Sequence, residues 1–185
     1  RLQDAGVVIL FRPLHEAAGG WFWWGAKGKE NYQKLWKILF DKVTYEYKFD
    51  NIIWIHNLEN IEWTVDENTY DMCGVDIYRR DKIPSNRNEH YKMLCEMTPK
   101  TKMKVLSELD TLCDIDTLFD DGTNWLYWCV WWGGFAWSEG ANSFEYLNKV
   151  YNHEKVITLD KLPWFDETCK LGYGAQMVLK KRKGR

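Results

Sequence analysis

The sequence has little that would mark a membrane-spanning, nucleic-acid-binding or disulfide-rich protein. None of its apolar runs approaches the roughly 18 residues that a membrane-spanning helix needs. The 25 Lys and Arg nearly balance the 27 Asp and Glu, so no net positive field favours nucleic acid or an anionic membrane. The five cysteines are an odd number without a CxxC pair, which argues against a disulfide framework and a thiolate zinc site. We therefore expect no membrane span, no nucleic-acid partner and no metal.

Several catalytic motifs are missing as well. There is no GxSxG nucleophile elbow and no glycine-rich phosphate loop. His15 and Glu16 are adjacent, but no second histidine follows at the spacing of the HExxH zinc motif. We therefore expect no cofactor, and we look for chemistry that side chains perform by themselves.

Aromatic residues, in contrast, are abundant. The 185 residues have the size and mixture of one compact domain, and they include 12 Trp, 10 Tyr and 8 Phe. Two clusters of Trp, in residues 21–24 and 125–132, border glycines. A single Trp usually fills a core, but glycine marks loops, where flat apolar faces can stack on sugar rings or bases.

Short apolar runs predict five buried strands, at residues 7–11, 52–55, 72–77, 103–106 and 125–132. Between the first two, apolar residues recur at helical spacing from Tyr32 to Val43 and predict an amphipathic helix. Shorter stripes predict further helices at residues 91–95, 115–119 and 144–151. Ser85 or Asn86 would cap the first of these, and Asn142 would cap the last.

The alternation of strands and helices predicts an α/β fold with parallel strands joined by crossover helices. Five such units are too few for a closed eightfold barrel, which takes about 250 residues.

Polar side chains follow the predicted strands at their carboxyl ends, which is where α/β proteins build ligand sites. These side chains are Arg12, His15, Glu16, His56, Asn57, Tyr78, Arg79 and Glu108. We interpret His56, Asn57 and Arg79 as a solvated rim. Cys73 and Cys129 fall inside strands, where a buried thiol is inert unless a base is nearby.

Glu16 and Glu108 form the most informative pair. They lie far apart in the sequence, yet both follow strands of one predicted sheet. Glycoside hydrolysis needs two such carboxyl groups, one as acid and one as nucleophile or base. An exposed loop glutamate is the competing interpretation of either residue.

The sequence also resembles a known family. Residues 8–25, VILFRPLHEAAGGWFWWG, resemble the signature of glycoside hydrolase family 26, whose commonest activity is endo-β-1,4-mannanase. The resemblance continues in order through NIIWIHN (51–57), GVDIY (74–78), KVLSELD (104–110) and WLYWCVWWGG (125–134). It covers roughly residues 5–163.

This resemblance implies a (β/α)8 barrel that cleaves β-1,4-mannosidic bonds in mannan-type polysaccharides with retention of configuration. It assigns Glu16 as acid/base and Glu108 as nucleophile. It further implies that His15 lies beside the sugar, that Tyr78 donates to the nucleophile, and that Trp21 and Trp131 stack on the substrate. Trp132 is a less secure platform than Trp131.

In the family barrel, the first strand of this sequence corresponds to strand four. We therefore expect an incomplete barrel of about strands four to eight, with residues 1–163 as the carboxyl-terminal portion of the catalytic domain and 164–185 as a tail of unassigned role. The resemblance implies a secreted or cell-envelope protein.

Three alternatives stay open at this point. The chain could be a non-catalytic carbohydrate-binding remnant, because half of the barrel would be missing. It could be a family relative that acts on another β-glucan or β-xylan. A nucleic-acid stacking module is the weakest alternative, because the basic residues do not alternate with the aromatics.

Overall fold

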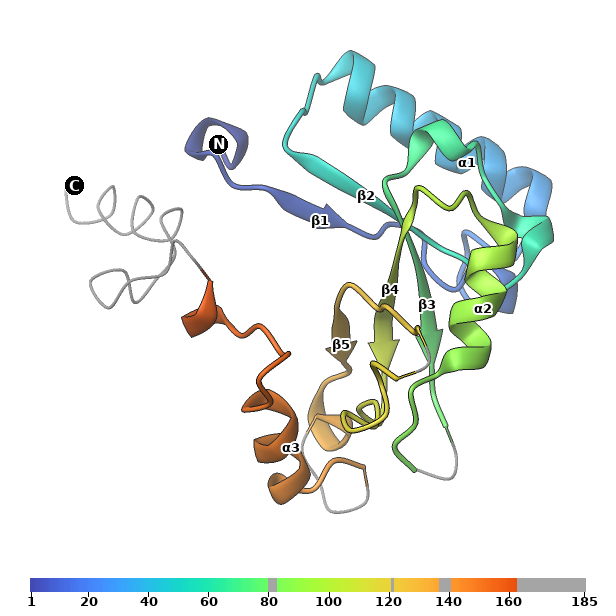
Figure 1. Ribbon diagram of the computed structural model, residues 1–185. Coiled ribbons are helices and arrows are strands. Elements are labelled where there is room, and N and C mark those ends of the chain that lie inside the picture. The colour runs from blue at the N-terminus through green and yellow to red at the C-terminus, as the bar shows by residue number, and fades with distance from the viewer. Residues whose placement is uncertain (80–82, 121, 137–140, 163–185) are drawn as a thin grey trace.

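The computed structural model describes residues 1–79, 83–120, 122–136 and 141–162. Within them, five strands form one parallel sheet in the order β1-β2-β3-β4-β5. Their bounds are β1 (Ile9–Phe11), β2 (Ile52–Asn57), β3 (Met72–Ile77), β4 (Met103–Leu109) and β5 (Trp128–Val130). Each strand pairs with the next in sequence and the order never reverses, as in a (β/α)8 barrel rather than a doubly wound sheet. The sheet curls through Figure 1 as an incomplete barrel, which confirms the predicted fold class.

All five predicted strands exist, but their ends differ from the prediction. β2 continues to Asn57 and β4 continues to Leu109, whereas β1 and β5 have three residues each. Glu108 therefore lies inside β4 and not after it. The predicted strands stopped before His56 and before Ser107, but inward-facing polar side chains such as Asn57 and Glu108 continue the ladder in a barrel.

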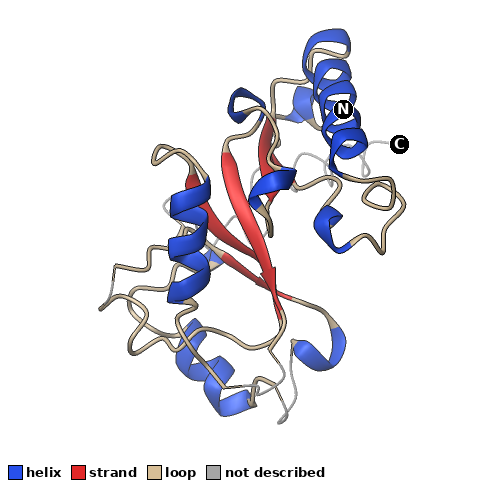
Figure 2. Ribbon diagram, turned by 90° about the vertical axis from the view of Figure 1, so that its right-hand side faces the viewer, coloured by secondary structure: helices blue, strands red, loops and turns tan. Residues whose placement is uncertain are grey.

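Helix α1 (Lys29–Asp41) confirms the predicted amphipathic helix and runs into a π-helical turn at Lys42–Glu46. It buries Tyr32, Trp36 and Phe40 against the outer face of the sheet, where the rings of Trp36 and Phe40 contact Trp54 of β2. Helix α2 (Asn88–Met97) packs alongside β3 and β4 (Figure 2). Its Leu94 belongs to the same hydrophobic core as Trp36 and Phe40 of α1, so both helices cover the same face of the sheet.

The structure differs from three of the predictions about helices. Helix α2 begins after Arg87, which has a left-handed φ of 60° and takes the N-cap position predicted for Ser85 or Asn86, while Oδ1 of Asn86 accepts from the Asn88 amide at 3.2 Å. Helix α3 (Phe144–Tyr151) is capped by Ser143, whose hydroxyl accepts from the Tyr146 amide, and not by Asn142. The stretch 115–119 forms turns and no helix, although its apolar residues Ile115 and Leu118 are buried.

Asn142 links two loops by hydrogen bonds instead of capping α3. Its side chain is buried, accepts from the Leu112 amide and donates to the carbonyl of Asp110. It therefore connects the segment before α3 to the chain leaving β4.

The two faces of the sheet bury different residues. The large core lies between the sheet and helices α1 and α2, and it contains Trp54, Val75 and Leu106. A smaller cluster of Ile55, Met72 and Val105 lies on the opposite, inner face, which alternate residues of the same strands supply. The inner face is the one that carries the functional side chains described below.

A local irregularity between β3 and β4 brings two acidic residues together. Val75 pairs with Leu106, but the next residue, Asp76, pairs with Glu108, so Ser107 is an extra residue in β4. A Cβ on Gly74 would lie 2.2 Å from the Ser107 hydroxyl oxygen, so a larger residue there would displace that hydroxyl. The shift places Asp76 and Glu108 side by side on the inner face.

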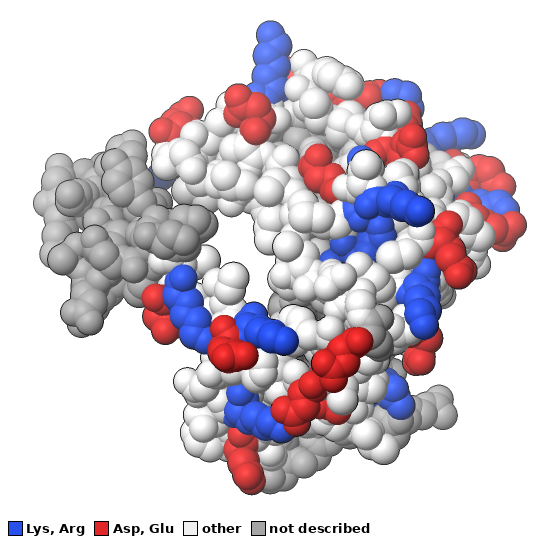
Figure 3. Space-filling view, viewed as in Figure 1, with Lys and Arg blue, Asp and Glu red and all other residues white. Residues whose placement is uncertain are grey.

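Among the described residues, no helix is both long and apolar enough to cross a membrane. On the face drawn in Figure 3, basic and acidic side chains alternate and no large patch of one sign forms.

Candidate active site

The functional side chains gather at the carboxyl ends of β1 to β4. Arg12 follows directly on β1, Asn57 ends β2, Asp76 lies near the end of β3, and Glu108 lies near the end of β4. Because parallel strands end at the same edge of the sheet, residues from four distant segments meet there.

Arg12 is the central cation of this group. Its Nη1 donates to Oδ2 of Asp76 at 2.9 Å and to Oδ1 of Asn57 at 3.3 Å, and its Nη2 donates to Oε1 of Glu108. Burial acts to lower the pKa of Arg12, but the charges of Asp76 and Glu108 outweigh it and raise the pKa. The guanidinium therefore stays charged and compensates two buried carboxyl groups.

Glu108 is almost fully buried and is held by two donors. The Tyr78 hydroxyl donates to Oε2 at 2.8 Å, while Arg12 donates to Oε1. Burial and the hydrogen bond to Glu108 raise the pKa of Tyr78, so the phenol keeps its proton and remains a donor. The two donors together fix the orientation of the Glu108 carboxyl group.

Glu16 lies on a strained turn across from Glu108. Leu14 and Glu16 both have left-handed backbone conformations, with φ of 54° and 52°. The Glu16 amide donates to Oδ1 of Asn57 at 2.9 Å, and the indole Nε1 of Trp21 donates to Oε2 of Glu16 at 3.1 Å. Neighbouring contacts therefore hold a backbone shape that a glutamate rarely adopts, as functional sites commonly do.

His15 is positioned between these groups. Its ring lies 5.0 Å from the ring of Phe22 and 5.8 Å from that of Trp24, and the Trp24 indole donates to its carbonyl at 2.8 Å. Its Nε2 lies 3.9 Å from Oε1 of Glu108. Burial and the charge of Arg12 lower the pKa of His15, so the imidazole is neutral near pH 7.

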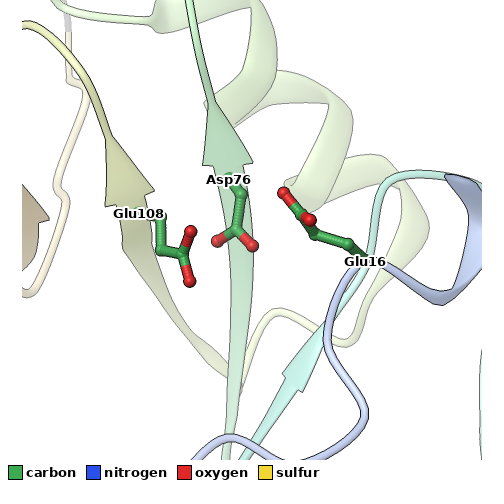
Figure 4. Close-up of side chains that lie close together, drawn as sticks. All are labelled: Glu16, Asp76 and Glu108. Atoms are coloured by element: carbon green, nitrogen blue, oxygen red, sulfur yellow. The ribbon is translucent and has the colours of Figure 1, made fainter. Parts of the chain in front are cut away.

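The spacing of the carboxyl groups decides what the site can do. One oxygen from each of Glu16, Asp76 and Glu108 lies within 4.8 Å of the others, and Figure 4 shows the three groups facing one another. Retaining glycosidases hold their two carboxyl groups about 5–5.5 Å apart, whereas inverting enzymes leave roughly 6.5–9.5 Å for a water. The pair Glu16 and Glu108 has the closer spacing.

Asp76 is the third carboxyl group. Burial, with the added repulsion of Glu108, Glu59 and Glu16, raises its pKa to about 7 despite the nearby Arg12. Three carboxylates at this spacing would also suit a divalent cation. Here the Arg12 guanidinium contacts two of the three, so the arginine supplies the positive charge of the cluster and we assign no metal to it.

Comparison with known proteins agrees with this geometry. The model of "Glycosyl hydrolase family 26" matches residues 1–161. The chain belongs to this family. The resemblance seen in the sequence is thereby confirmed.

Similar members of family 26 are named mannanases. A mannan endo-1,4-beta-mannosidase of Thermothelomyces thermophilus is 35% identical over 90% of this chain and 34% of its own length. The GH26-CBM35 beta-(1,4)-mannanase of Podospora anserina has a solved structure that is 36% identical, with a TM-score of 0.84, over 88% of this chain and 36% of that one.

A third relative was solved with a ligand. It is the beta-mannanase from a symbiotic protist of the termite Reticulitermes speratus, in complex with gluco-manno-oligosaccharide. It is 31% identical with a TM-score of 0.81, over 89% of this chain and 51% of that one. The chain therefore spans between a third and a half of the length of these family 26 relatives.

Five of the six predicted site residues lie close together in this family 26 chain: His15, Glu16, Trp21, Tyr78 and Glu108. Trp131 lies one residue beyond β5, with its amide bonded to the Leu109 carbonyl and its side chain part exposed. Trp132 is 73% exposed.

The interpretation of His56 and Asn57 as part of a solvated rim is wrong. His56 is fully buried on the outer face of the sheet, among Tyr32, Trp36 and Tyr70. Asn57 is buried in the site, where it binds Arg12 and the Glu16 amide. Arg79 is part-buried, and its amide donates to Oδ2 of Asp110 at 2.8 Å.

The sequence interpretation assigns no role in the site to Arg12, Asn57 or Asp76. The sequence did hold a signal for Asp76, since it is the one charged residue inside the apolar run 72–77. Cys73 is buried in β3 and burial raises the pKa of its thiol to about 12, in line with an inert group, whereas Cys129 in β5 is exposed.

Proposed function

We propose that this chain supplies the catalytic face of a retaining glycoside hydrolase that cleaves β-1,4-mannosidic bonds in mannan-type polysaccharides. The observation that carries the proposal is the spacing of Glu16 and Glu108, whose carboxylate oxygens lie within 4.8 Å of each other. Residues 1–163 would be the carboxyl-terminal portion of the catalytic domain, in agreement with a family match that ends at residue 161. Residues 164–185 would be a tail.

Glu108 is the nucleophile in this proposal. Arg12 and Tyr78 each donate a hydrogen bond to one of its oxygens, and these two donors hold the carboxyl group in place facing Glu16. In the first step, a Glu108 oxygen forms a bond to the anomeric carbon while the bond from that carbon to the glycosidic oxygen breaks.

Glu16 is the acid/base residue. It transfers its proton to the departing glycosidic oxygen in the first step. Once Glu108 is esterified, its negative charge is gone, and Glu16 can take a proton from the incoming water, which attacks the anomeric carbon and releases Glu108. The indole of Trp21, which donates to Oε2 of Glu16, holds the carboxyl group in place.

The neighbouring residues bind the sugar. The neutral His15, close to Glu108, can hydrogen-bond a hydroxyl of the sugar under attack. Trp21, with 65% of its surface exposed, and Trp131 offer apolar faces for stacking on sugar rings.

The relatives support the substrate class. They are named mannanases, and one of them was solved with a gluco-manno-oligosaccharide. Because polysaccharides of this kind are too large to cross a membrane, we further propose a secreted or cell-envelope location.

Reducing-sugar release from mannan by the full-length natural protein tests the activity, and proton NMR of the first-formed product tests its anomeric configuration. We expect hydrolysis with a product of retained configuration. Glu108→Ala should abolish turnover, and added azide should restore it and give a glycosyl azide of inverted configuration. A first product of inverted configuration, or turnover by Glu108→Ala close to that of the unaltered protein, would refute the assignment.

A further inference from the structure

Asn57 contacts the segments that carry both proposed catalytic carboxyl groups, and the mechanism above gives it no part. It ends β2 with only 3% of its surface exposed. Its Oδ1 accepts two hydrogen bonds, one from the Glu16 amide at 2.9 Å and one from Nη1 of Arg12 at 3.3 Å. The same guanidinium donates through Nη2 to Glu108. One amide oxygen is therefore shared by the turn that carries Glu16 and the arginine that holds Glu108.

The two ends of the Asn57 side chain are not interchangeable. Its Nδ2 donates to the hydroxyl oxygen of Ser107 in β4 at 3.3 Å, and that hydroxyl donates to the Val75 carbonyl of β3. A flipped amide would turn its N–H groups toward two other donors, the Glu16 amide and the Arg12 guanidinium, and would lose both of these hydrogen bonds. The surrounding donors therefore fix the oxygen of Asn57 on the side of the site.

The hydrogen bond to the Glu16 amide matters because of the backbone around it. Leu14 and Glu16 have φ of 54° and 52°, a left-handed conformation that residues other than glycine rarely adopt. Such a conformation persists only where neighbouring contacts hold it. The direction of the Cα–Cβ bond of Glu16 depends on this backbone shape, so a relaxed turn would point the carboxyl group elsewhere.

We propose that Asn57 is a positioning residue for the hydrolysis. Its side-chain oxygen holds the Glu16 turn and the Arg12 guanidinium at one point, and so sets the placement of Glu16 relative to Glu108. This inference rests on the proposed function for its catalytic meaning, but the hold on the Glu16 turn is measurable without turnover. Because misplacement of a reacting group by about 1 Å can cost on the order of a hundredfold in rate, loss of this oxygen should lower kcat far more than it changes KM.

Hydrogen exchange of the Glu16 amide, followed by NMR in the full-length natural protein, measures this hold directly. A backbone amide exchanges with solvent when its hydrogen bond opens. Asn57→Leu keeps the approximate size of the side chain but has no acceptor, so the Glu16 amide should exchange faster by about tenfold or more. Asn57→Asp keeps an oxygen that faces the two donors and should stay near the unaltered rate. An unchanged rate in folded Asn57→Leu would overturn the proposal.

The matched control is Asn142→Leu, at a second buried asparagine. Asn142 accepts from the Leu112 amide and donates to the Asp110 carbonyl, so its replacement also removes hydrogen bonds of a buried side chain. These partners belong to the segment after β4 and not to the Glu16 turn. Measured well below its melting temperature, Asn142→Leu should lose stability but leave the exchange of the Glu16 amide unchanged. An equal rise in both variants would mark general loosening of the fold and would count against the proposal.

A measurement on the unaltered protein covers the case in which Asn57→Leu fails to fold. Glu16 is only part-buried, so water can reach its amide whenever the hydrogen bond to Asn57 opens. The Glu16 amide should therefore exchange at least about tenfold more slowly than the same amide in an unstructured peptide. Exchange at the peptide rate would show that Asn57 does not hold the turn, and the proposal would fail.

Kinetics then separate this proposal from the proposed function. If the unaltered protein hydrolyses mannan, Asn57→Leu should lower kcat by about tenfold to a hundredfold with little change in KM, and Asn57→Asp should lose less. Asn142→Leu should keep the kcat of the unaltered protein, and an unaltered kcat in folded Asn57→Leu would contradict the role of Asn57 in catalysis. If the unaltered protein is inactive on mannan at every pH, the proposed function fails, while the exchange of the Glu16 amide still decides whether Asn57 holds the turn.

Discussion

At the scale of single residues, the buried charges of this chain depend on one arginine. Arg12 contacts Asp76, Asn57 and Glu108, and both of the acidic partners are almost completely buried. A buried ion pair is weak evidence for stability by itself, but the removal of one partner leaves an uncompensated charge. Arg12 therefore supports both the fold and the site.

Arg12→Met should lower the free energy of unfolding by about 3 kcal/mol or more, because Asp76 and Glu108 would remain buried without their cation. Urea unfolding near pH 7 measures the loss. The control is Lys29→Met, which removes an exposed pair with Glu62 and should cost far less, because water screens an exposed ion pair. Equal losses in the two variants would contradict the role given to Arg12.

His56 predicts a pH dependence of stability. Burial lowers its pKa to about 3 from the ordinary value of 6.5, so the unfolded chain takes up a proton that the folded chain does not. The stability that His56 contributes is present above pH 6.5 and is lost as the pH falls toward 3, with a slope of up to about 1.4 kcal/mol per pH unit. The pKa values of Asp76 and Glu59 are raised to about 7 in the folded chain. The stability that these two protonated carboxyl groups contribute is therefore lost as the pH rises through about 7.

The comparison of wild type with His56→Phe isolates this contribution. Urea midpoints measured at intervals from pH 4 to pH 7 should fall more steeply toward acid in the wild type than in the variant. Parallel curves would show that the buried imidazole is not the group responsible.

Trp131 tests the predicted stacking on substrate. Stacking of a base on one aromatic side chain contributes on the order of 1–3 kcal/mol of binding free energy, and we take the same range for a sugar ring. Trp131→Ala should therefore reduce kcat/KM roughly tenfold to a hundredfold. Melting temperature and kinetics should be measured on the same sample, with the more exposed Trp132→Ala alongside. Lost stability with unchanged kinetics would make Trp131 a packing residue and Trp132 the better platform.

At the scale of elements, the irregular pairing of β3 and β4 builds the acidic pair. The extra residue Ser107 brings Glu108 opposite Asp76, and Gly74 leaves the space that Ser107 needs. Ser107 also links β4 to β2 and β3. Its hydroxyl accepts from the Asn57 side chain of β2 at 3.3 Å and donates to the Val75 carbonyl of β3 at 3.3 Å.

Gly74→Ala should destabilise the protein by about 1–3 kcal/mol, because the new methyl group would displace the Ser107 hydroxyl. In Gly74→Ala with Ser107→Ala, the hydroxyl is gone, and the loss should be smaller than the sum of the two single losses. Strictly additive losses, measured by urea unfolding, would show that this contact does not limit the packing of β3 on β4.

At the scale of the whole molecule, the sheet of the described residues has two edge strands, β1 and β5. The β1 edge exposes Leu10 and borders an apolar cavity of about 430 Å³, lined in part by Phe11, Val43 and Phe49. Exposed edges and apolar surfaces of this kind promote association.

A polypeptide of residues 1–185 alone should therefore associate as its concentration rises and should be inactive on mannan. Light scattering after size exclusion measures the association. Leu10→Lys places a charge on the β1 edge and should reduce the association without filling the cavity. A monomer with full activity and cooperative unfolding would contradict this expectation.

Much of this architecture could be predicted from the sequence, because the signals are local. Apolar runs located all five strands, and helical spacing located α1, since burial on one or both faces imposes a period on the sequence. Glu16 and Glu108 could be singled out because polar residues at strand ends stand out against these runs.

Only the tertiary structure decided which polar residues belong to the site. His56 and Asn57 are neighbours in the sequence, yet alternation along β2 sends the first into the outer core and the second to Arg12 and Glu16. The extra residue in β4 cannot be seen in a linear pattern, although it sets Glu108 beside Asp76. The pairing of Arg12 with both acids depends on contacts between strands far apart in sequence, which exist only once the sheet has curled.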